Sequence, residues 1–440
     1  MRRFRIWNHL SSSLWFVPIL CVLAGVCLSF ATIALDRSVS LVPRSLSGDP
    51  DAALAILTTV AASMVTLTGL VLTITMVVVQ LATGQFTPRV LRTILRDRPS
   101  QFAIGVFVAT FAHAMLVMRE VRHPTASAPE GFVPGVAIIV AFVLIIVSIM
   151  FLVSYVNHIG QSLRAASLID SVGDDTRDLI LELYPEHTPR RSPRPELPAE
   201  PTRIVVAPQP GVLFKVAEDE LVEEAAKSDV RIRMIPRVGD FVPTGGSLFA
   251  VYGDGPVAPD DLRRCIVLGK ERTLHQDVAY GIRMLVDVAV RALSPASGDP
   301  TTAVQAIDRI HDCLRLLVSR DFPTGEHFDR EGRLRLIVPV LSWEGIVHVA
   351  LDELRLLAVQ SLQATRRTTA MLQDLIELAP EERQAPLRYQ LQRLDTLAHE
   401  AFDAPDSDWA MEPDQQGVGS GPVGILQTVD REPRAVVRRG

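Results

Sequence analysis

Residues 52–86 read AALAILTTVAASMVTLTGLVLTITMVVVQLATGQF, and the basic segment TPRVLRTILRDRP follows directly at residues 87–99. No charged side chain occurs between Ala52 and Arg89. A helix needs about 20 apolar residues to cross the hydrocarbon core of a bilayer. A helix in a soluble protein is rarely apolar on every face over such a length. The stretch therefore predicts a membrane-spanning helix.

Three further apolar runs accompany this one. The chain is 48% hydrophobic with a mean hydropathy of +0.24, and its apolar residues are concentrated before about Ile159. The first run resembles a secretory signal, but it is longer than the apolar core of a signal peptide, so we interpret it as an uncleaved span. The predicted transmembrane region covers residues 14–158, with four spans at residues 14–35, 52–82, 102–118 and 133–155.

Arginine residues near the ends of the spans predict the orientation. The amino-terminal segment 1–13 carries Arg2, Arg3 and Arg5, and four more arginines lie in residues 87–99. The two loops expected on the opposite side carry only two arginines each. Positive charge near span ends is retained in the cytoplasm. We therefore expect a multi-pass protein of the cell inner membrane with both termini in the cytoplasm.

The second span carries a polar stripe at three-, four- and seven-residue spacing, which places its members on one helix face. The stripe consists of Thr59, Ser63, Thr66, Thr73 and Gln80. Threonine hydroxyls can replace part of the hydration shell of an ion, so the stripe can line a pore. Small and hydroxylated residues also mediate close packing of membrane helices. Thr58, Thr68 and Thr75 lie off the stripe and favour packing.

Charged residues are absent from the middle of every predicted span. Intramembrane charge is the usual mark of a proton relay or a coupled transporter. His113 in the third span is either a hydrogen-bonded structural residue, which we favour, or a gate or relay.

The second half of the chain predicts an α+β region in the cytoplasm. A helical extension at residues 159–185 precedes a proline- and arginine-rich linker at residues 186–202. Short strand patterns then predict a small β module at residues 203–256, which resembles the barrel-sandwich fold of lipoyl and biotinyl domains without their modified lysine. A mostly helical domain follows at residues 257–402, with a hairpin that turns near Glu331 and Gly332, and we expect a disordered tail at residues 403–440.

Local signals mark helix starts in this region. Asp299 followed by Pro300 predicts a helix that begins with a carboxylate cap, and Ser342 predicts another start. The densest polar group lies around these helices and comprises Arg272, Asp277, Arg283, Asp287, Arg291 and Asp299. Arginine pairs bidentately with phosphate or carboxylate, so these residues are candidates for an anion site. An ion-paired helix surface at an interface is the alternative, which we favour.

Signatures of other functions are missing from the sequence. It has no G-x-S-x-G elbow, Walker phosphate loop or HExxH motif, and we predict no enzymatic activity and no cofactor. His275 with Asp277, and His311 with Asp312, point to different helix faces and are poor chelates, so we predict no metal site. The net charge of −6 and the lack of a basic stripe argue against a nucleic-acid partner. The four cysteines do not form a disulfide pattern.

Residues 272–303, RTLHQDVAYGIRMLVDVAVRALSPASGDPTTA, carry a specific pattern: R-T, Q-D, G-I-R-x-L-x-D-x-A-x-R-A-L-S-P and D-P-x-T-A. With QLATGQFTPRVL at residues 80–91 and GDFVPTGGSLFAVY at residues 239–252, this sequence resembles a bacterial family of predicted polytopic membrane proteins known only as a domain of unknown function. Gly298 departs from the asparagine that is usual in the family. The resemblance implies four spans followed by a cytoplasmic domain, and no established activity.

These observations lead to two functional hypotheses. The first is an oligomeric channel or transport-related assembly, regulated by its cytoplasmic domain and built from copies of this chain in the lipid bilayer. The second is a membrane-anchored sensor or scaffold that binds an anionic ligand or a protein partner.

Overall fold

The computed structural model describes residues 16–38, 49–85, 98–123, 132–162, 165–186, 198–274, 276–403 and 406–419. The chain forms two compact units, residues 1–168 and residues 169–440. The amino-terminal segment 1–13 and most of the linker at residues 186–202 lie outside the described residues.

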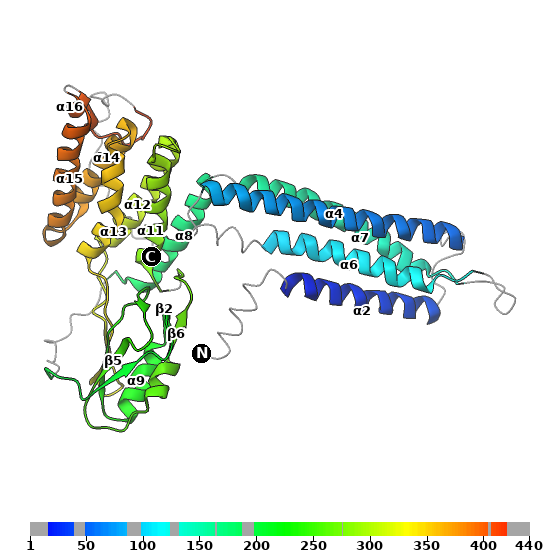
Figure 1. The fold of residues 1–440 in the computed structure, drawn as a ribbon, viewed down its shortest axis with the longest axis horizontal. Coiled ribbons are helices and arrows are strands. Elements are labelled where there is room, and N and C mark those ends of the chain that lie inside the picture. The colour runs from blue at the N-terminus through cyan, green and yellow to red at the C-terminus, as the bar shows by residue number, and fades with distance from the viewer. Residues whose placement is uncertain are drawn as a thin grey trace, which may run out of the picture. The chain divides into compact units, whose positions relative to one another are not determined.

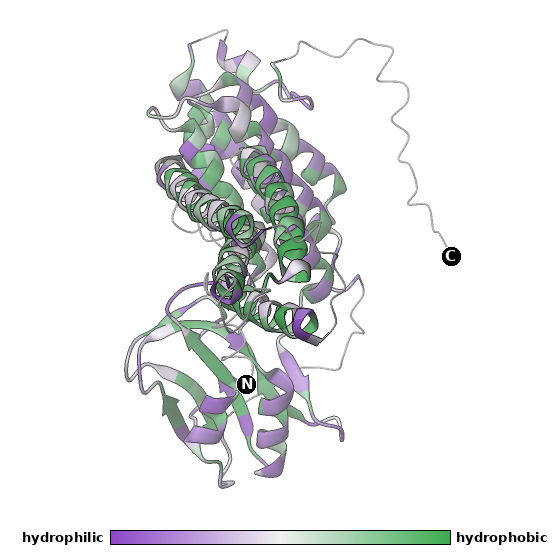
Figure 2. Ribbon diagram, turned by 90° about the vertical axis from the view of Figure 1, so that its right-hand side faces the viewer, coloured by the Kyte–Doolittle hydropathy of each residue, from purple (hydrophilic) through white to green (hydrophobic). Residues whose placement is uncertain are grey.

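The first unit is a bundle of four long helices, labelled in Figure 1 as α2 (Phe16–Ser38), α4 (Pro50–Gln85), α6 (Arg98–Glu120) and α7 (Gly135–Ser162). All four are long and apolar enough to cross a membrane, which confirms the prediction of four candidate spans. Their ribbons are mostly green in the hydropathy colouring of Figure 2. Helix α6 packs against each of the other three.

Close approach and buried polar contacts hold this bundle together. A Cβ atom at Gly25 of α2 would lie 2.9 Å from the Cβ of Ala109 in α6, so glycine permits the contact between these helices. The carboxylate of Asp36 accepts the backbone N–H groups of Val136 and Ala137 at 2.9 and 3.0 Å. Asp36 therefore satisfies donors that the first turn of α7 would otherwise leave unpaired.

The second unit begins within α8 (Ala165–Leu183) and contains two sheets. The larger sheet has the order β1 (Arg203–Val206), β5 (Ser247–Tyr252), β3 (Arg231–Met234), β8 (Leu334–Ile337) and β7 (Glu326–Phe328). The smaller sheet has the order β4 (Phe241–Val242), β2 (Gly211–Val216) and β6 (Ile266–Gly269). Leu213, Ile232 and Phe249, with at most 1% exposure, lie in the core of this part, alongside α9 (Glu218–Lys227) and α10 (Pro259–Arg264).

The sheets extend beyond the β module that the sequence predicts at residues 203–256. Strand β8 pairs in parallel with β3, with Ile232 opposite Leu336, and β6 joins β2 from residue 266 onward. The predicted hairpin is present as β7 and β8, but it belongs to the larger sheet. The boundary at residue 256 is therefore wrong. Parallel strands need a long connection, so sequence order does not show which strands pair.

The helical part of the second unit contains α11 (Val278–Leu293), α12 (Pro300–Val318), α13 (Trp343–Ala358), α14 (Leu362–Leu378) and α15 (Glu381–Ala401). The predicted helix starts are confirmed: Asp299 accepts the backbone N–H of Thr302 at 3.0 Å, and Ser342 accepts that of Gly345 at 3.2 Å. Helix α11 packs against α12 and α13, and α14 packs against α12 and α15.

Part of the segment that we expected to be disordered is folded. Residues 406–419 include α16 (Asp406–Ala410). The ring of Trp409 lies against the guanidinium of Arg366, which is 4.2 Å from the ring centroid. Asp414, 1% exposed, accepts backbone N–H groups from Gln416, Gly417 and Gly419. The prediction of disorder is wrong for this segment, because contacts with α14 compensate for its polar, glycine-rich composition.

Candidate functional sites

The polar stripe of the second predicted span lies on the outer face of α4. Its members are all exposed: Thr59, Ser63, Thr66, Thr73 and Gln80. Leu57, Met64 and Val71 instead face the interior of the bundle. Each of the four stripe hydroxyls donates to the carbonyl four residues earlier in α4, at 2.7–3.1 Å. Within this chain, the stripe therefore does not pack α4 against the other spans.

Other polar contacts lie inside the bundle. The hydroxyl of Thr75, off the stripe, lies 2.7 Å from the hydroxyl of Tyr155 in α7. His113 is fully buried, with Nδ1 2.9 Å from Ser29 Oγ and Nε2 3.0 Å from the carbonyl oxygen of Ala137. Both ring nitrogens have partners, so His113 joins α2, α6 and α7 as a hydrogen-bonded structural residue.

The six residues of the candidate anion site do not form one group. Arg283 donates to Asp287 at 2.7 Å and to Glu353 of α13 at 2.5 Å, so its guanidinium is paired with carboxylates of the same chain. Arg291 lies in the last turn of α11, and Asp299 caps α12. Of the six, Asp277 lines the cavity described below, and Arg272 contacts the same loop as Asp277.

Arg272 and Asp277 meet at the loop that precedes β4. Arg272 Nε donates to the carbonyl of Gly239 at 2.5 Å. Asp277 caps α11 by accepting the backbone N–H of Tyr280 at 3.0 Å, and its second carboxylate oxygen lies against Gly239. Gly239 has a φ of +92°, and an added Cβ would collide with Asp277. Glycine is thus required here by both conformation and space.

Asp277 faces a cavity of about 430 Å³, called the pocket below. It lies between the end of α8, the start of α11 and the β7–β8 hairpin. Its polar lining includes Tyr184, Glu218, Arg237, Asp277 and His327. Much of the rest of the lining is apolar, such as Val278, Val338 and Leu341. A concave, largely apolar site with a few polar groups is typical of small-molecule binding.

Burial raises the pKa of two ionisable groups that line the pocket. Burial, together with the nearby charge of Asp277, raises the pKa of Tyr184 to about 12, and the charge of Arg237 opposes this effect. Burial also raises the pKa of the Asp277 carboxyl, although its bond from Tyr280 and the charges of Arg272 and Arg237 act in the opposite direction. Sequence reasoning missed Tyr184, Arg237 and His327, because they come from segments far apart in the chain.

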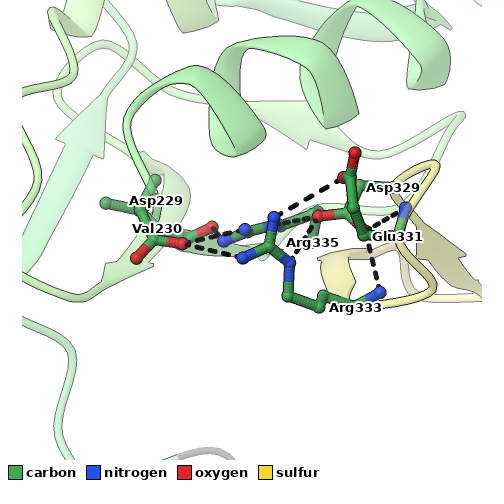
Figure 3. Close-up of polar contacts among 6 residues, drawn as sticks. All are labelled: Asp229, Val230, Asp329, Glu331, Arg333 and Arg335. Carbon is green, nitrogen blue, oxygen red and sulfur yellow. Dashed lines mark hydrogen bonds and ion pairs between the residues drawn. The ribbon is translucent and has the colours of Figure 1, made fainter.

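A second polar cluster crosslinks the β-rich part (Figure 3). Arg335 of β8 is 4% exposed, and its guanidinium donates to Asp329 at 2.8 Å, to Asp229 at 2.8 Å and to the carbonyl of Val230 at 3.2 Å. Every nitrogen of the guanidinium therefore has a partner. The charge of Arg335 is neutralised within the chain, and its contacts hold the residues before β3 to the hairpin.

A third cluster lies between α12 and α14. Arg367 donates to Asp308 at 2.5 Å and lies 3.0 Å from His311, which itself lies 2.8 Å from Asp374. Asp312, the residue beside His311, instead accepts from Arg177 of α8 at 2.7 Å. The two neighbours thus have separate partners on different helices. His275 lies outside the described residues.

Residues 11–374 match the profile of a family described as "Predicted membrane protein (DUF2254)". The chain belongs to this family. Similar proteins include Mb1321c of Mycobacterium bovis and MT1328 and Rv1290c of Mycobacterium tuberculosis, each named only as an uncharacterized protein. Each is 34% identical over 367 residues, which is 80% of this chain and 70% of the relative. No solved structure matches the chain.

Membership of DUF2254 confirms the family resemblance of the motif at residues 272–303. The matched region includes all four candidate spans and the pocket, and it ends within α14. The family description names a membrane protein and no reaction.

Proposed function

We propose that this protein is non-enzymatic and forms a homo-oligomeric channel or transport assembly in the inner membrane, regulated by its second unit in the cytoplasm. The observation that supports the proposal is the outward polar stripe on α4. Thr59, Ser63 and Thr66 face away from the other spans of the same chain.

The stripe is expected to contact a partner outside the chain. Small and hydroxylated residues are enriched where membrane helices pack against one another, and polar groups are costly against lipid. Pore lining and helix packing both place another molecule or water against α4. A second copy supplies an identical stripe, and symmetric association repeats the contact around an axis.

The hydroxyl geometry suits a cation path. Each stripe hydroxyl uses its hydrogen on a carbonyl of α4, for example Ser63 on Thr59 at 2.7 Å. A hydroxyl oxygen keeps acceptor lone pairs when it donates. The stripe therefore presents acceptors outward without a fixed charge.

Cysteine crosslinking tests whether the stripe meets a second copy. The full chain, with its native cysteines replaced by alanine, receives Ser63→Cys in α4 or Ile146→Cys in α7; the latter is a 59% exposed control away from the stripe. We expect oxidation in native membranes to give disulfide-linked dimers for Ser63→Cys and monomers for Ile146→Cys. Monomers for both variants, together with a monomeric mass in detergent, would remove the oligomer.

Planar-bilayer recording tests the channel itself. We expect currents from the purified full chain, with a conductance that changes in Thr66→Val and stays unchanged in Thr58→Val, which alters an exposed threonine off the stripe. Silence across voltage, tension and pH would contradict the channel.

A membrane-anchored sensor is the second candidate function, and the pocket favours it. A cavity of about 430 Å³ with buried polar groups fits a small ligand in the second unit. The surface around Arg283 is a weaker candidate because its guanidinium already binds Asp287 and Glu353. Equal binding of phosphorylated metabolites to the native chain and to Arg283→Ala would remove that surface as an anion site.

A further inference from the structure

Three polar groups of the pocket lack a hydrogen-bond partner among the residues that the structure describes. The hydroxyl of Tyr184 is one, although this residue is only 8% exposed. The guanidinium of Arg237 is another, with its nearest carboxylate, that of Asp240, 3.8 Å away. The third is the carboxylate oxygen of Asp277 that does not cap α11. Tyr184 and Asp277 are buried, and buried polar groups normally have partners, whereas the side chain of Arg237 is 40% exposed. All three line the pocket with hydrogen-bonding capacity that a ligand can use.

We propose that the pocket binds an α-amino acid with an aliphatic side chain. The ammonium group pairs with Asp277, and the carboxylate pairs with Arg237 and the hydroxyl of Tyr184. The aliphatic side chain packs on the apolar wall that includes Val278 and Leu341. This inference rests on the second candidate function and names its ligand.

The charges of the lining favour a zwitterion. Glu218 lies 3.5 Å from His327, and Glu326 has a partner, so the ligand class follows from the charges that act on Tyr184. Asp277, which is acidic, and Arg237, which is cationic, are the two charges that act on Tyr184. Asp277 would repel a lone anion, and Arg237 would repel a lone cation. A zwitterion matches both groups.

The protonation states are consistent with these roles. With a pKa raised to about 12, Tyr184 keeps its proton at neutral pH and acts as a donor. Burial raises the pKa of Asp277, and a neighbouring ammonium stabilises its charged form. Binding therefore favours the carboxylate, and affinity falls as the pH drops through the pKa of Asp277. Arginine binds a carboxylate with two parallel hydrogen bonds, which fixes the orientation of the ligand.

Calorimetric titration of the purified full chain tests the inference with three probes. L-leucine carries both charges, 4-methylpentanoate lacks the ammonium group, and isopentylamine lacks the carboxylate. We expect L-leucine to bind at least about tenfold more tightly than either analogue, since each lacks one charge-assisted contact.

Matched variants locate the site. Tyr184→Phe, Arg237→Gln and Asp277→Asn each remove one contact, and asparagine still caps a helix. The controls repeat each change outside the pocket, as Tyr389→Phe, Arg233→Gln and Asp299→Asn, the last at the cap of α12. We expect the pocket variants to weaken L-leucine binding about tenfold or more and the controls to leave it unchanged.

The outcomes separate the ligand class from the sensor function. If an analogue binds as tightly as L-leucine and the pocket variants abolish its binding, the zwitterion is wrong and the pocket remains a ligand site. If L-leucine binds equally to pocket and control variants, the assigned site is wrong. If none of the three probes nor inorganic phosphate binds, both the inference and the small-molecule sensor fail.

Discussion

At the residue scale, Arg335 shows what a buried cation requires. Its three guanidinium nitrogens bind Asp329, Asp229 and the carbonyl of Val230. A buried charge is tolerated when it is paired and its hydrogen bonds are satisfied, and removal of one partner leaves an uncompensated charge. Arg335 is therefore a structural residue of the β-rich part.

Asp329→Asn is expected to destabilise the protein at neutral pH. Burial raises the pKa of Asp329, but hydrogen bonds from Arg335 and from the backbone of Arg333 outweigh this effect and lower the pKa to about 2. Because the folded pKa lies below the unfolded value of about 3.9, the stabilisation is present above pH ~4 and is lost as the pH falls toward ~2. Thermal unfolding from pH 7 to pH 2 measures the effect.

The control for Asp329→Asn is Glu331→Gln, which changes a 63% exposed carboxylate of the same hairpin. We expect the native chain to lose its advantage over Asp329→Asn below about pH 4, where the carboxylate is protonated in the unfolded chain. A difference that is constant across this range would contradict the ionic role of Asp329.

At the element scale, the contact between α8 and α11 depends on a glycine. Thr176 of α8 is fully buried, and an added Cβ at Gly281 of α11 would collide with its hydroxyl and lie 2.9 Å from its Cγ2. Ion pairs outside this contact hold α8 to α12, with Arg309 on Asp170 and Arg177 on Asp312, each at 2.7 Å. The glycine sets how closely α8 approaches α11.

Gly281→Ala is expected to lower the free energy of unfolding by about 1–3 kcal/mol, the usual cost of overpacking. Chemical denaturation of the solubilised chain measures this change. Thr176→Ala removes the colliding atoms, so the double variant is expected to recover part of the loss. The control is Gly160→Ala in α7, where an added Cβ has no neighbour within 4 Å. An equal loss for Gly281→Ala and Gly160→Ala would contradict the packing argument.

At the scale of the whole molecule, four candidate spans precede a second unit with its own sheets and helices. The orientation that we propose follows from the arginines of residues 87–99 and of the amino-terminal segment, because positive charge is retained in the cytoplasm. With an even number of spans, both termini lie on the same side.

Reporter fusions test this orientation. A reporter that works only in the cytoplasm is expected to be active when it is fused to the carboxyl terminus. The same reporter is expected to be inactive in a fusion that ends at Ser127, after the third span, because that position lies on the opposite side. The native chain is expected to stay in membranes during extraction with alkaline carbonate. A periplasmic carboxyl terminus would overturn the proposed topology.

The sequence by itself determined the four candidate spans, the helix caps at Asp299 and Ser342 and the family. These features depend on local composition or on residues a few positions apart, such as a cap and the N–H group three residues later. It also placed the stripe on one face of α4, because helical periodicity fixes which residues share a face.

Only the tertiary structure decided which groups meet. It directed the stripe away from the other spans, paired β8 with β3, paired Arg283 with Glu353 and folded residues 406–419 onto α14. It also brought Tyr184, Arg237 and Asp277 to one pocket. These contacts join residues far apart in the chain, and their formation depends on burial and packing of the whole unit, which local spacing does not encode.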